Sequence, residues 1–457
     1  MNPFSNNISP LKTLLAVNKY SPAIEGLRAI AVVSVIINHF NESILPSGYL
    51  GVDMFFVISG FVITCSLLKR NGTDINQFHY GFYTRRIKRL LPALLFCFVI
   101  AGILISLFNP SPNDHIVTGL LSLIGFSNFD LYFNAIDYWG DSAKLNPYTH
   151  TWSLGVEEQF YMLFPLIIWL SLGKIWSTSR LKLVFLILSV LNVMSLLLFI
   201  YLSTYDPMSA YFLLPSRFWE IGAGCTLAIY LNIKKTRGII HLIISSIPIY
   251  FLLAIYGAIF FIPLEHAAIS TVAIVMCTLL IILKVKSGEE SDTKYSNILT
   301  HKVTMYLGAI SYSLYLWHWV IITISRWTIG INPETIFIQV SLILFFSVFS
   351  YHLIEKPLRA SKWRSSRQVK IYFSVMIFIS IALTSNIFLN KNNNAIYLGK
   401  DVTQKTKIDF KINKSLTCNK EKKHKILTIG NSHSNHIIPM LKRIGKHCNM
   451  EILNHKH

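Results

Sequence analysis

Long apolar runs separated by short polar loops repeat along most of this chain. Eleven of these runs are long enough to cross a bilayer when tilt is allowed for. They lie near 27–45, 48–68, 90–108, 153–172, 183–202, 211–231, 239–261, 266–284, 303–325, 335–354 and 371–389. A further run at 115–127 is shorter, and it predicts a re-entrant or interfacial segment. The pattern therefore predicts an all-α polytopic membrane protein.

The pattern changes after the last run. A polar stretch is typical of a linker, and the short apolar run KILTIG (425–430) after it predicts a buried strand. A helical run follows, and MEIL (450–453) could form a second strand. These strands indicate the start of an α/β domain, with too few residues to bury a core of its own. The expected parts are a membrane domain at 1–360, an additional transmembrane helix at 361–390, an extracytoplasmic linker at 391–424 and the α/β segment at 425–457.

Composition supports the membrane assignment. Hydrophobic residues make up 53% of the chain and charged residues 14%, whereas soluble chains carry about 25% charged residues. The net charge of +20 would suit nucleic acid, but the basic residues lie mostly in short loops between apolar runs. We therefore expect membrane lipid, and no nucleic acid, as a partner. The first apolar run has no cleavage site after it, so we expect it to remain as an anchor.

The basic residues also predict the orientation. With a cytoplasmic N-terminus, 25 Lys and Arg residues fall on the inner side, against three on the outer side before the tail. The three outer residues are Lys144, Arg217 and Arg326. Short inner loops carry an excess of Lys and Arg in membrane proteins. The N-terminus is therefore expected to be cytoplasmic, and the tail beyond about residue 390 extracytoplasmic.

The first apolar run carries Arg28 and His39, which are eleven residues apart. That spacing places both on one face of a helix, about 16 Å apart along its axis. A charge within hydrocarbon costs at least about 2.5–3.5 kcal/mol, so such residues usually have a function. His39 suits a general base, Arg28 suits a phosphate, and Asp53 or Glu157 could be their partners. The alternative is that Arg28 reaches the inner interface and His39 packs in a polar pocket.

Two more motifs carry charge at the ends of apolar runs. In RRIKRLLP, Arg86 and Arg89 are three residues apart and so are neighbours on a helix, where they form either a phosphate clamp or a simple inner-side anchor. In WSLGVEEQFY, Glu157 and Glu158 are adjacent, so at most one of them points squarely into a helix bundle. We take Glu157 to be that residue.

Other polar residues within the apolar runs favour structural roles. Glu220, His318 and Glu355 are expected to form polar contacts between helices. Four cysteines are expected to be packing residues, namely Cys65, Cys97, Cys225 and Cys277. In the exported tail, Cys418 and Cys448 could form a disulfide. No metal-ligand spacing is present in the sequence, so no metal is expected.

Ser432 lies in GNSHSNH, where a predicted strand ends and a helix begins. Backbone N–H groups at a helix start can stabilise an oxyanion beside such a hydroxyl. A serine nucleophile also needs a histidine base and usually a carboxylate. The alternative is that Ser432 caps the helix.

Together these motifs resemble those of the membrane acyltransferase 3 family of bacterial O-acyltransferases. The resemblance covers about 20–360 and rests on EGLRA followed by His39, GVDMFFVISGF, the Arg86–Arg89 pair, WSLGVEEQFY, and SYSLYLWHW followed by EKPLR. The last apolar run, the linker and GNSHSNH resemble the subgroup that is fused to an SGNH-hydrolase-like domain.

The resemblance implies an activity. The membrane domain would take an acetyl group from cytosolic acetyl-CoA and pass it outward across the bacterial inner membrane. The exported domain would place it on a hydroxyl of lipopolysaccharide, peptidoglycan or exopolysaccharide. Arg28 and His39 match the essential pair of the family, Arg86 and Arg89 match its Arg-x-x-Arg motif, and Ser432 matches the serine of its exported domain.

Two departures from the family pattern affect the exported part. Asn431 stands where the family usually has Asp, and the sequence stops before the Asp and His that complete the triad. The resemblance therefore implies a truncated exported domain that is inactive by itself. Two alternatives to the acyltransferase stay open: a transporter of acyl or glycan groups without catalysis, and a degenerate remnant. The motifs make no prediction of the oligomeric state.

Overall fold

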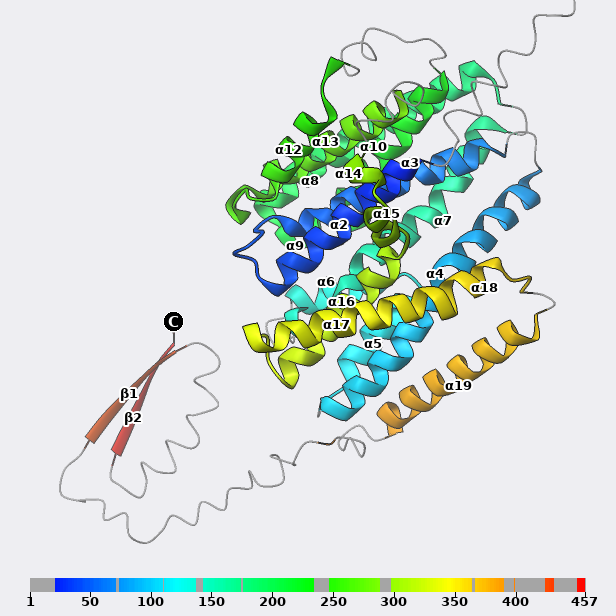
Figure 1. Cartoon of the computed structure of the whole chain (residues 1–457). Helices are drawn as coiled ribbons and strands as arrows, with labels where there is room; N and C mark the ends of the chain where they lie inside the picture. The colour runs from blue at the N-terminus through cyan, green and yellow to red at the C-terminus, as the bar shows by residue number, and fades with distance from the viewer. Residues whose placement is uncertain are drawn as a thin grey trace, which may run out of the picture. The chain divides into compact units, whose positions relative to one another are not determined.

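The computed structural model describes residues 21–456 except 71–73, 110, 137–142, 174–175, 234–245, 288–296, 364–365, 390–397, 399–423 and 431–449. The chain forms two compact units, Met1–Leu398 and Gly399–His457. The described part of the first unit consists of helices (Figure 1).

The longer helices of the first unit are α2 (Pro22–Phe40), α3 (Gly51–Leu68), α4 (Ile75–Phe108), α7 (Trp152–Leu172), α8 (Thr178–Tyr205), α10 (Leu214–Ile233), α13 (Ala267–Ser287), α16 (Ser311–Trp327), α17 (Pro333–Phe349) and α19 (Arg367–Leu389). The shorter ones are α5 (Asn113–Leu123), α6 (Ser127–Ile136), α9 (Pro207–Phe212), α12 (Ile249–Ile259), α14 (Asn297–Thr300), α15 (Lys302–Ala309) and α18 (Lys356–Ala360). Single helical turns are η1 (Gly48–Leu50), η2 (Ala143–Leu145), η3 (Thr149–Thr151) and η4 (Leu264–His266), and η5 (Ser350–Glu355) is π-helical.

Each of the eleven predicted runs overlaps one of these helices. Among the described residues, seven helical segments are long and apolar enough to cross a membrane, or eight if α15 and α16, bent by 69°, form one span. This confirms an all-α polytopic membrane protein, whereas the number eleven stays a prediction. The run at 115–127 covers most of α5 and the turn that follows it, and ends at the first residue of α6. Helices α5 and α6 pack against each other, and the re-entrant or interfacial character of the run stays a prediction.

The interior of the bundle depends on close approach between helices. In lipid, apolar burial gives little net drive for helix association, so small residues at contacts and interhelical polar bonds matter more. A Cβ atom on Gly60 of α3 would overlap the carbonyl oxygen of Ile221 in α10, and one on Gly224 of α10 would overlap that of Val57. These two glycines therefore let α3 and α10 pack backbone to backbone.

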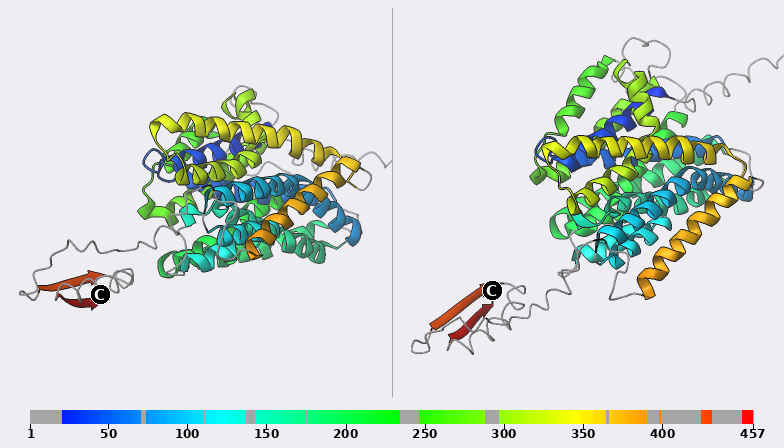
Figure 2. Two further views of the ribbon diagram at one scale, coloured as in Figure 1. Left: turned by 90° about the horizontal axis from the view of Figure 1, so that it is seen from below. Right: turned by 60° about the horizontal axis from the view of Figure 1, so that its bottom comes forward.

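The helices that carry the predicted site residues pack together. Helix α2 contacts α3, α15 and α16, and α4 contacts α16 and η5. Figure 1 shows α2 and α3 close together inside the bundle, and Figure 2 shows α19 along its edge, where it contacts α4 and α5. Predicted site residues that are far apart in sequence are therefore brought together within the first unit.

The second unit contains two described strands, β1 (His424–Gly430) and β2 (Met450–Lys456). They pair in parallel, with His424 opposite Met450 and Gly430 opposite Lys456. The two predicted strands are thus confirmed. A parallel pair requires a crossover connection, and the rest of the α/β domain stays a prediction because residues 431–449 lie outside the described part. Ser432, Cys418 and Cys448 also lie outside the described residues.

Candidate active site: two adjoining cavities

Four of the six predicted site residues line one cavity inside the helical bundle, which we call the arginine cavity. They are Arg28 of α2, Arg86 and Arg89 of α4, and Glu157 of α7. Helices α3 and α16 complete the wall, and the cavity volume is about 110 Å³. Its polar lining and size allow it to hold several water molecules or the reactive end of a slender ligand.

Arg86 and Glu157 are held by neighbouring side chains. The guanidinium of Arg86 lies over the ring of Tyr161, with 4.5 Å from Cζ to the ring centre. The hydroxyl of Tyr161 donates to Glu157 Oε2 at 2.6 Å, and that of Ser59 donates to Oε1 at 3.0 Å. Both oxygens of Glu157 are therefore fixed by α7 itself and by α3. Glu158 instead lies beside Gly125, in the turn between α5 and α6, and does not line the arginine cavity.

The arginine cavity carries more positive than negative charge. Arg28 Nη1 pairs with Glu25 at 3.0 Å. Within the described part of the chain, neither Arg86 nor Arg89 has an ion pair, and the buried Nε of Arg89 lacks a hydrogen-bond partner. A guanidinium is suited to planar, bidentate contact with phosphate or carboxylate. The cavity can therefore bind an anionic group.

His39, at the last turn of α2, lines a second and larger cavity of about 710 Å³, the histidine cavity. Lys144, Arg217 and Arg326, the three basic residues assigned to the outer side, line it as well. The two cavities adjoin, because Val52 and Tyr315 line both.

His39 is fixed on several sides. Its Nδ1 lies 3.0 Å from Nε2 of His318, and the two rings are parallel to within 3°. The Trp319 ring meets it edge on at 4.6 Å between ring centres. Arg326 Nη2 donates to the carbonyl oxygen of His39 at 3.4 Å. Asn38 donates to the carbonyl oxygen of Leu45 at 2.8 Å and so fixes the turn that follows α2.

A third histidine, His150 of η3, was not singled out by the sequence. It is 3% exposed, lines the histidine cavity and lies 5.8 Å from the His318 ring, centre to centre. Burial lowers the pKa of His150 well below its ordinary value, because a charged imidazole would lose its hydration there, and a charge on His318 would lower it further. The site therefore favours the neutral form of the His150 imidazole. Its position two residues before Trp152, at the start of WSLGVEEQFY, was the available signal.

Tyr315 separates the two cavities. It is 6% exposed, and its hydroxyl donates to the carbonyl oxygen of His150 at 2.8 Å and lies 2.8 Å from Ser153 Oγ. Its ring is 5.4 Å from that of His318. The sequence motif SYSLYLWHW therefore supplies both the shared wall and the neighbour of His39, although only His318 was noted in it.

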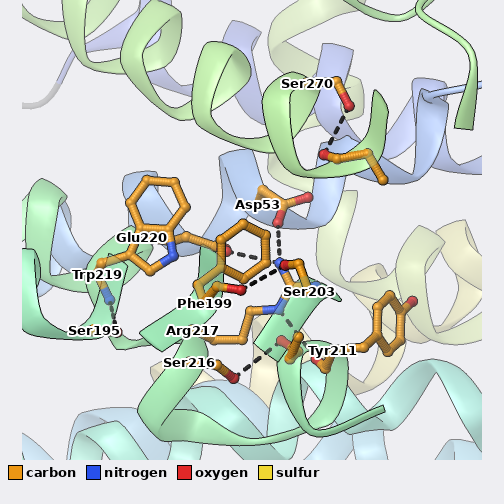
Figure 3. A network of polar contacts seen from close by, with 12 residues as sticks. Asp53, Ser195, Phe199, Ser203, Tyr211, Ser216, Arg217, Trp219, Glu220 and Ser270 are labelled. Carbon is orange, nitrogen blue, oxygen red and sulfur yellow. Dashed lines mark hydrogen bonds and ion pairs between the residues drawn. The ribbon is translucent and has the colours of Figure 1, made fainter. Parts of the chain in front are cut away.

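The expectation that Asp53 could partner Arg28 or His39 is wrong. Asp53 lies in the first turn of α3 and faces α10, where it accepts from Arg217 Nη1 at 2.8 Å (Figure 3). The same nitrogen donates to Glu220 at 2.8 Å, and Arg217 Nε donates to the carbonyl oxygen of Tyr211 at 3.2 Å. Arg217 is 5% exposed within α10, so it is a bundle residue and not a loop residue.

The remaining polar residues have structural contacts. Glu355 of η5 accepts from Ser313 of α16 at 3.2 Å, Glu220 pairs with Arg217, and His318 contacts His39 across two helices. The four cysteines of the apolar runs are buried and unbonded to one another. In the described part of the chain, no group of three or more His, Cys, Asp or Glu side chains is placed to hold a metal ion.

Comparison with known proteins identifies the family. The sequence profile described as "Acyltransferase domain" matches residues 21–355. A Staphylococcus aureus protein named "Putative O-acetyltransferase" is 31% identical over 84% of this chain and 65% of its own length. The Bacillus subtilis "Putative peptidoglycan O-acetyltransferase YrhL" is 32% identical over 78% of this chain and 57% of its own.

"O-acetyltransferase OatA" of Staphylococcus aureus is 31% identical over 76% of this chain and 58% of its own length. The chain thus spans less than two thirds of the length of these relatives. The search of solved structures found no match. Since the profile covers α2 through η5 and every residue that lines the arginine cavity, the chain belongs to the acyltransferase 3 family of membrane proteins.

Proposed function

We propose that this chain is a membrane O-acyltransferase that takes an acetyl group from cytosolic acetyl-CoA and transfers it to a hydroxyl of a cell-surface polysaccharide. The observation that carries the proposal is the pair of adjoining cavities. One contains Arg28, Arg86 and Arg89, and the other contains His39. An anion site and a base are thus separated by a wall of two shared side chains.

The charges support acetyl-CoA as the donor. CoA carries phosphates, and three guanidinium groups at the arginine cavity suit phosphate recognition. The cavity of about 110 Å³ suits the narrow thioester end better than the nucleotide. The nucleotide would therefore stay outside, near the start of α4, with the thioester directed toward Tyr315.

The loop charges support the direction of transfer. The arginine cavity lies next to the N-terminal half of α4, which carries basic residues assigned to the cytoplasmic side. The histidine cavity is lined by Lys144 and Arg326, which were assigned to the outer side. Under the positive-inside rule, donor and acceptor approach from opposite faces of the bacterial inner membrane.

His39 is the proposed general base. It takes the proton of an acceptor hydroxyl as the oxygen attacks the thioester carbon, and the C–S bond breaks. The proton then passes from His39 to the departing thiolate. Glu157, bonded to Tyr161 and Ser59, is proposed to fix the charges of the arginine cavity. In a longer chain, Ser432 of the exported segment would relay the acetyl group to the sugar.

Acetyl-CoA turnover tests the proposal. We would purify the chain in detergent and follow CoA release with and without chitotetraose, beside His39→Ala. The control is His352→Ala, an exposed histidine of η5. We expect CoA release that is lost in His39→Ala and retained in His352→Ala. Folded protein without CoA release, or release that does not depend on His39, would overturn the proposal and favour the transporter or the remnant.

A further inference from the structure

His318 is a buried histidine that contacts the proposed base but lies outside both cavities. It is 0% exposed, and it lines neither the arginine cavity nor the histidine cavity. Its Nδ1 lies 3.2 Å from the carbonyl oxygen of Leu314, one turn earlier in α16, and its Nε2 lies 3.0 Å from Nδ1 of His39. Both ring nitrogens of His318 are therefore engaged, and substrate cannot reach it directly.

The positions of the protons follow from these two contacts. A carbonyl oxygen only accepts, so Nδ1 of His318 must carry a proton for its bond to Leu314. A neutral imidazole carries one proton, so Nε2 of His318 is an acceptor. The contact with His39 then requires a proton on Nδ1 of His39. In neutral His39, Nε2 is consequently unprotonated.

We propose that His318 is a positioning residue that holds His39 in its Nδ1–H tautomer, so that Nε2 is the base that takes the acceptor proton. The inference rests on the proposed function, because it assigns a role within the same reaction. In other proteins, the group that bonds one ring nitrogen of a functional histidine sets its tautomer and orientation. Here that partner is a neutral imidazole, and a carboxylate does not occupy the position.

The charged groups around His39 determine how easily it gives up a proton. The groups that face His39 are His318, Trp319 and Arg326 of α16, Lys144 of η2 and His150 of η3. Lys144 pairs with Glu42 at 2.8 Å, at an exposed site. When Nε2 gains the proton of the acceptor hydroxyl, the Nδ1–H···Nε2 bond becomes charge-assisted, while the nearby cations oppose the new charge. The proton therefore leaves His39 readily for the thiolate.

Kinetics of three variants test the role. His318→Phe keeps a ring but removes the acceptor, whereas His318→Gln offers a side-chain carbonyl oxygen to Nδ1–H of His39. We expect His318→Phe to lower kcat by about 10–100-fold with little change in the KM for acetyl-CoA, and His318→Gln to recover about tenfold of that loss. The control is His115→Phe, which removes a buried histidine that stacks on Trp327 and should keep the wild-type kcat.

Nitrogen NMR reads the tautomer directly. In protein labelled with ¹⁵N-histidine, the His39 signals are those that disappear in His39→Gln. We expect the proton on Nδ1 in the wild type and on Nε2 in His318→Phe. A wild-type proton on Nε2, or an undiminished kcat in folded His318→Phe, would overturn the inference. If the wild type releases no CoA, the proposed function fails, yet the NMR measurement still decides the tautomer.

Discussion

Of the three arginines that line the arginine cavity, Arg89 has the fewest partners among the described residues of the protein. Its Nε is buried without a hydrogen-bond partner, and within the described residues it has no ion pair. Arg86, by comparison, lies over the Tyr161 ring. A buried donor that lacks a partner carries a desolvation penalty, which a bound anion would remove.

Substitution of Arg89 should therefore weaken donor binding. A hydrogen bond to a charged group is worth about 1.5–3 kcal/mol, so Arg89→Ala should raise the KM for acetyl-CoA by about 10–100-fold. The matched control is Arg85→Ala, since Arg85 belongs to the same helix but is exposed. Steady-state CoA release measures both variants. Equal KM values for the two would show that the motif is an anchor and not a clamp.

Arg217 is a residue whose ion pairs we expect to stabilise the fold. It is a single cation between two buried carboxylates, Asp53 and Glu220, and removal of one partner of a buried pair costs about 3–5 kcal/mol. We expect Arg217→Met to lower the free energy of unfolding by about that amount. The measurement is thermal or denaturant unfolding in detergent.

The triple substitution Asp53→Asn, Arg217→Met, Glu220→Gln separates charge from packing. It removes all three charges while keeping similar side-chain volumes. Since the loss in Arg217→Met comes from unpaired buried carboxylates, the triple variant should be more stable than the single one. If both are equally destabilised, the packing of Arg217 between Trp152, Phe199 and Tyr211 accounts for the effect.

At the scale of elements, the contact between α3 and α10 depends on two glycines. A Cβ atom at Gly224 would overlap backbone that cannot move aside cheaply, and overpacking costs about 1–3 kcal/mol or more. We therefore expect Gly224→Ala to lower the melting temperature. The control is Gly257→Ala in α12, where a Cβ atom meets nothing within 4 Å, and where helix propensity favours Ala by about 0.5–1 kcal/mol. A melting temperature unchanged by Gly224→Ala would mean that the two helices separate easily.

Apolar runs predicted the helices well because a bilayer requires long apolar segments whose backbone groups bond internally. They could not predict the break at Ile310 between α15 and α16, bent by 69°, since Ile310 itself is apolar and 0% exposed. The turn between α5 and α6, which lies within 115–127, was missed for a similar reason. Gly125, with φ of +77°, lies between the two helices and could have indicated the turn.

At the scale of the whole molecule, the loop charges predict orientation. A reporter that is active only outside the cytoplasm, such as alkaline phosphatase, should be active when fused after residue 390 and inactive when fused after residue 72. The physical reason is the excess of Lys and Arg on the loops assigned to the inner side. Activity at the second position would reverse the sides assigned to the two cavities.

The sequence also predicted part of the site. Charged residues in apolar runs are costly, which marked Arg28, His39 and Glu157 as candidates. The sequence did not predict which of these residues contact each other. Asp53 was expected to partner Arg28 or His39 of the first apolar run, but it accepts a hydrogen bond from Arg217 of α10. Partners such as Tyr315 and Trp319 belong to an apolar run in which aromatic residues are ordinary. The sequence of this run does not indicate which face of its helix borders a cavity.

Val52 and Tyr315, the two residues shared by the cavities, have a bioenergetic consequence. Water-filled spaces on both sides of such a thin wall would place most of the membrane voltage across one aromatic ring, its hydroxyl tied to His150 and Ser153. A voltage of 100 mV is worth about 2.3 kcal/mol per elementary charge. The transferred acetyl group is neutral and crosses without electrical work, whereas the proton that the proposed reaction passes from His39 to the departing thiolate moves through that field, as any other proton or hydroxide ion would. The Tyr315 ring, across which donor and acceptor meet, must therefore also keep other ions from crossing between the two cavities, since their flow would discharge the membrane voltage.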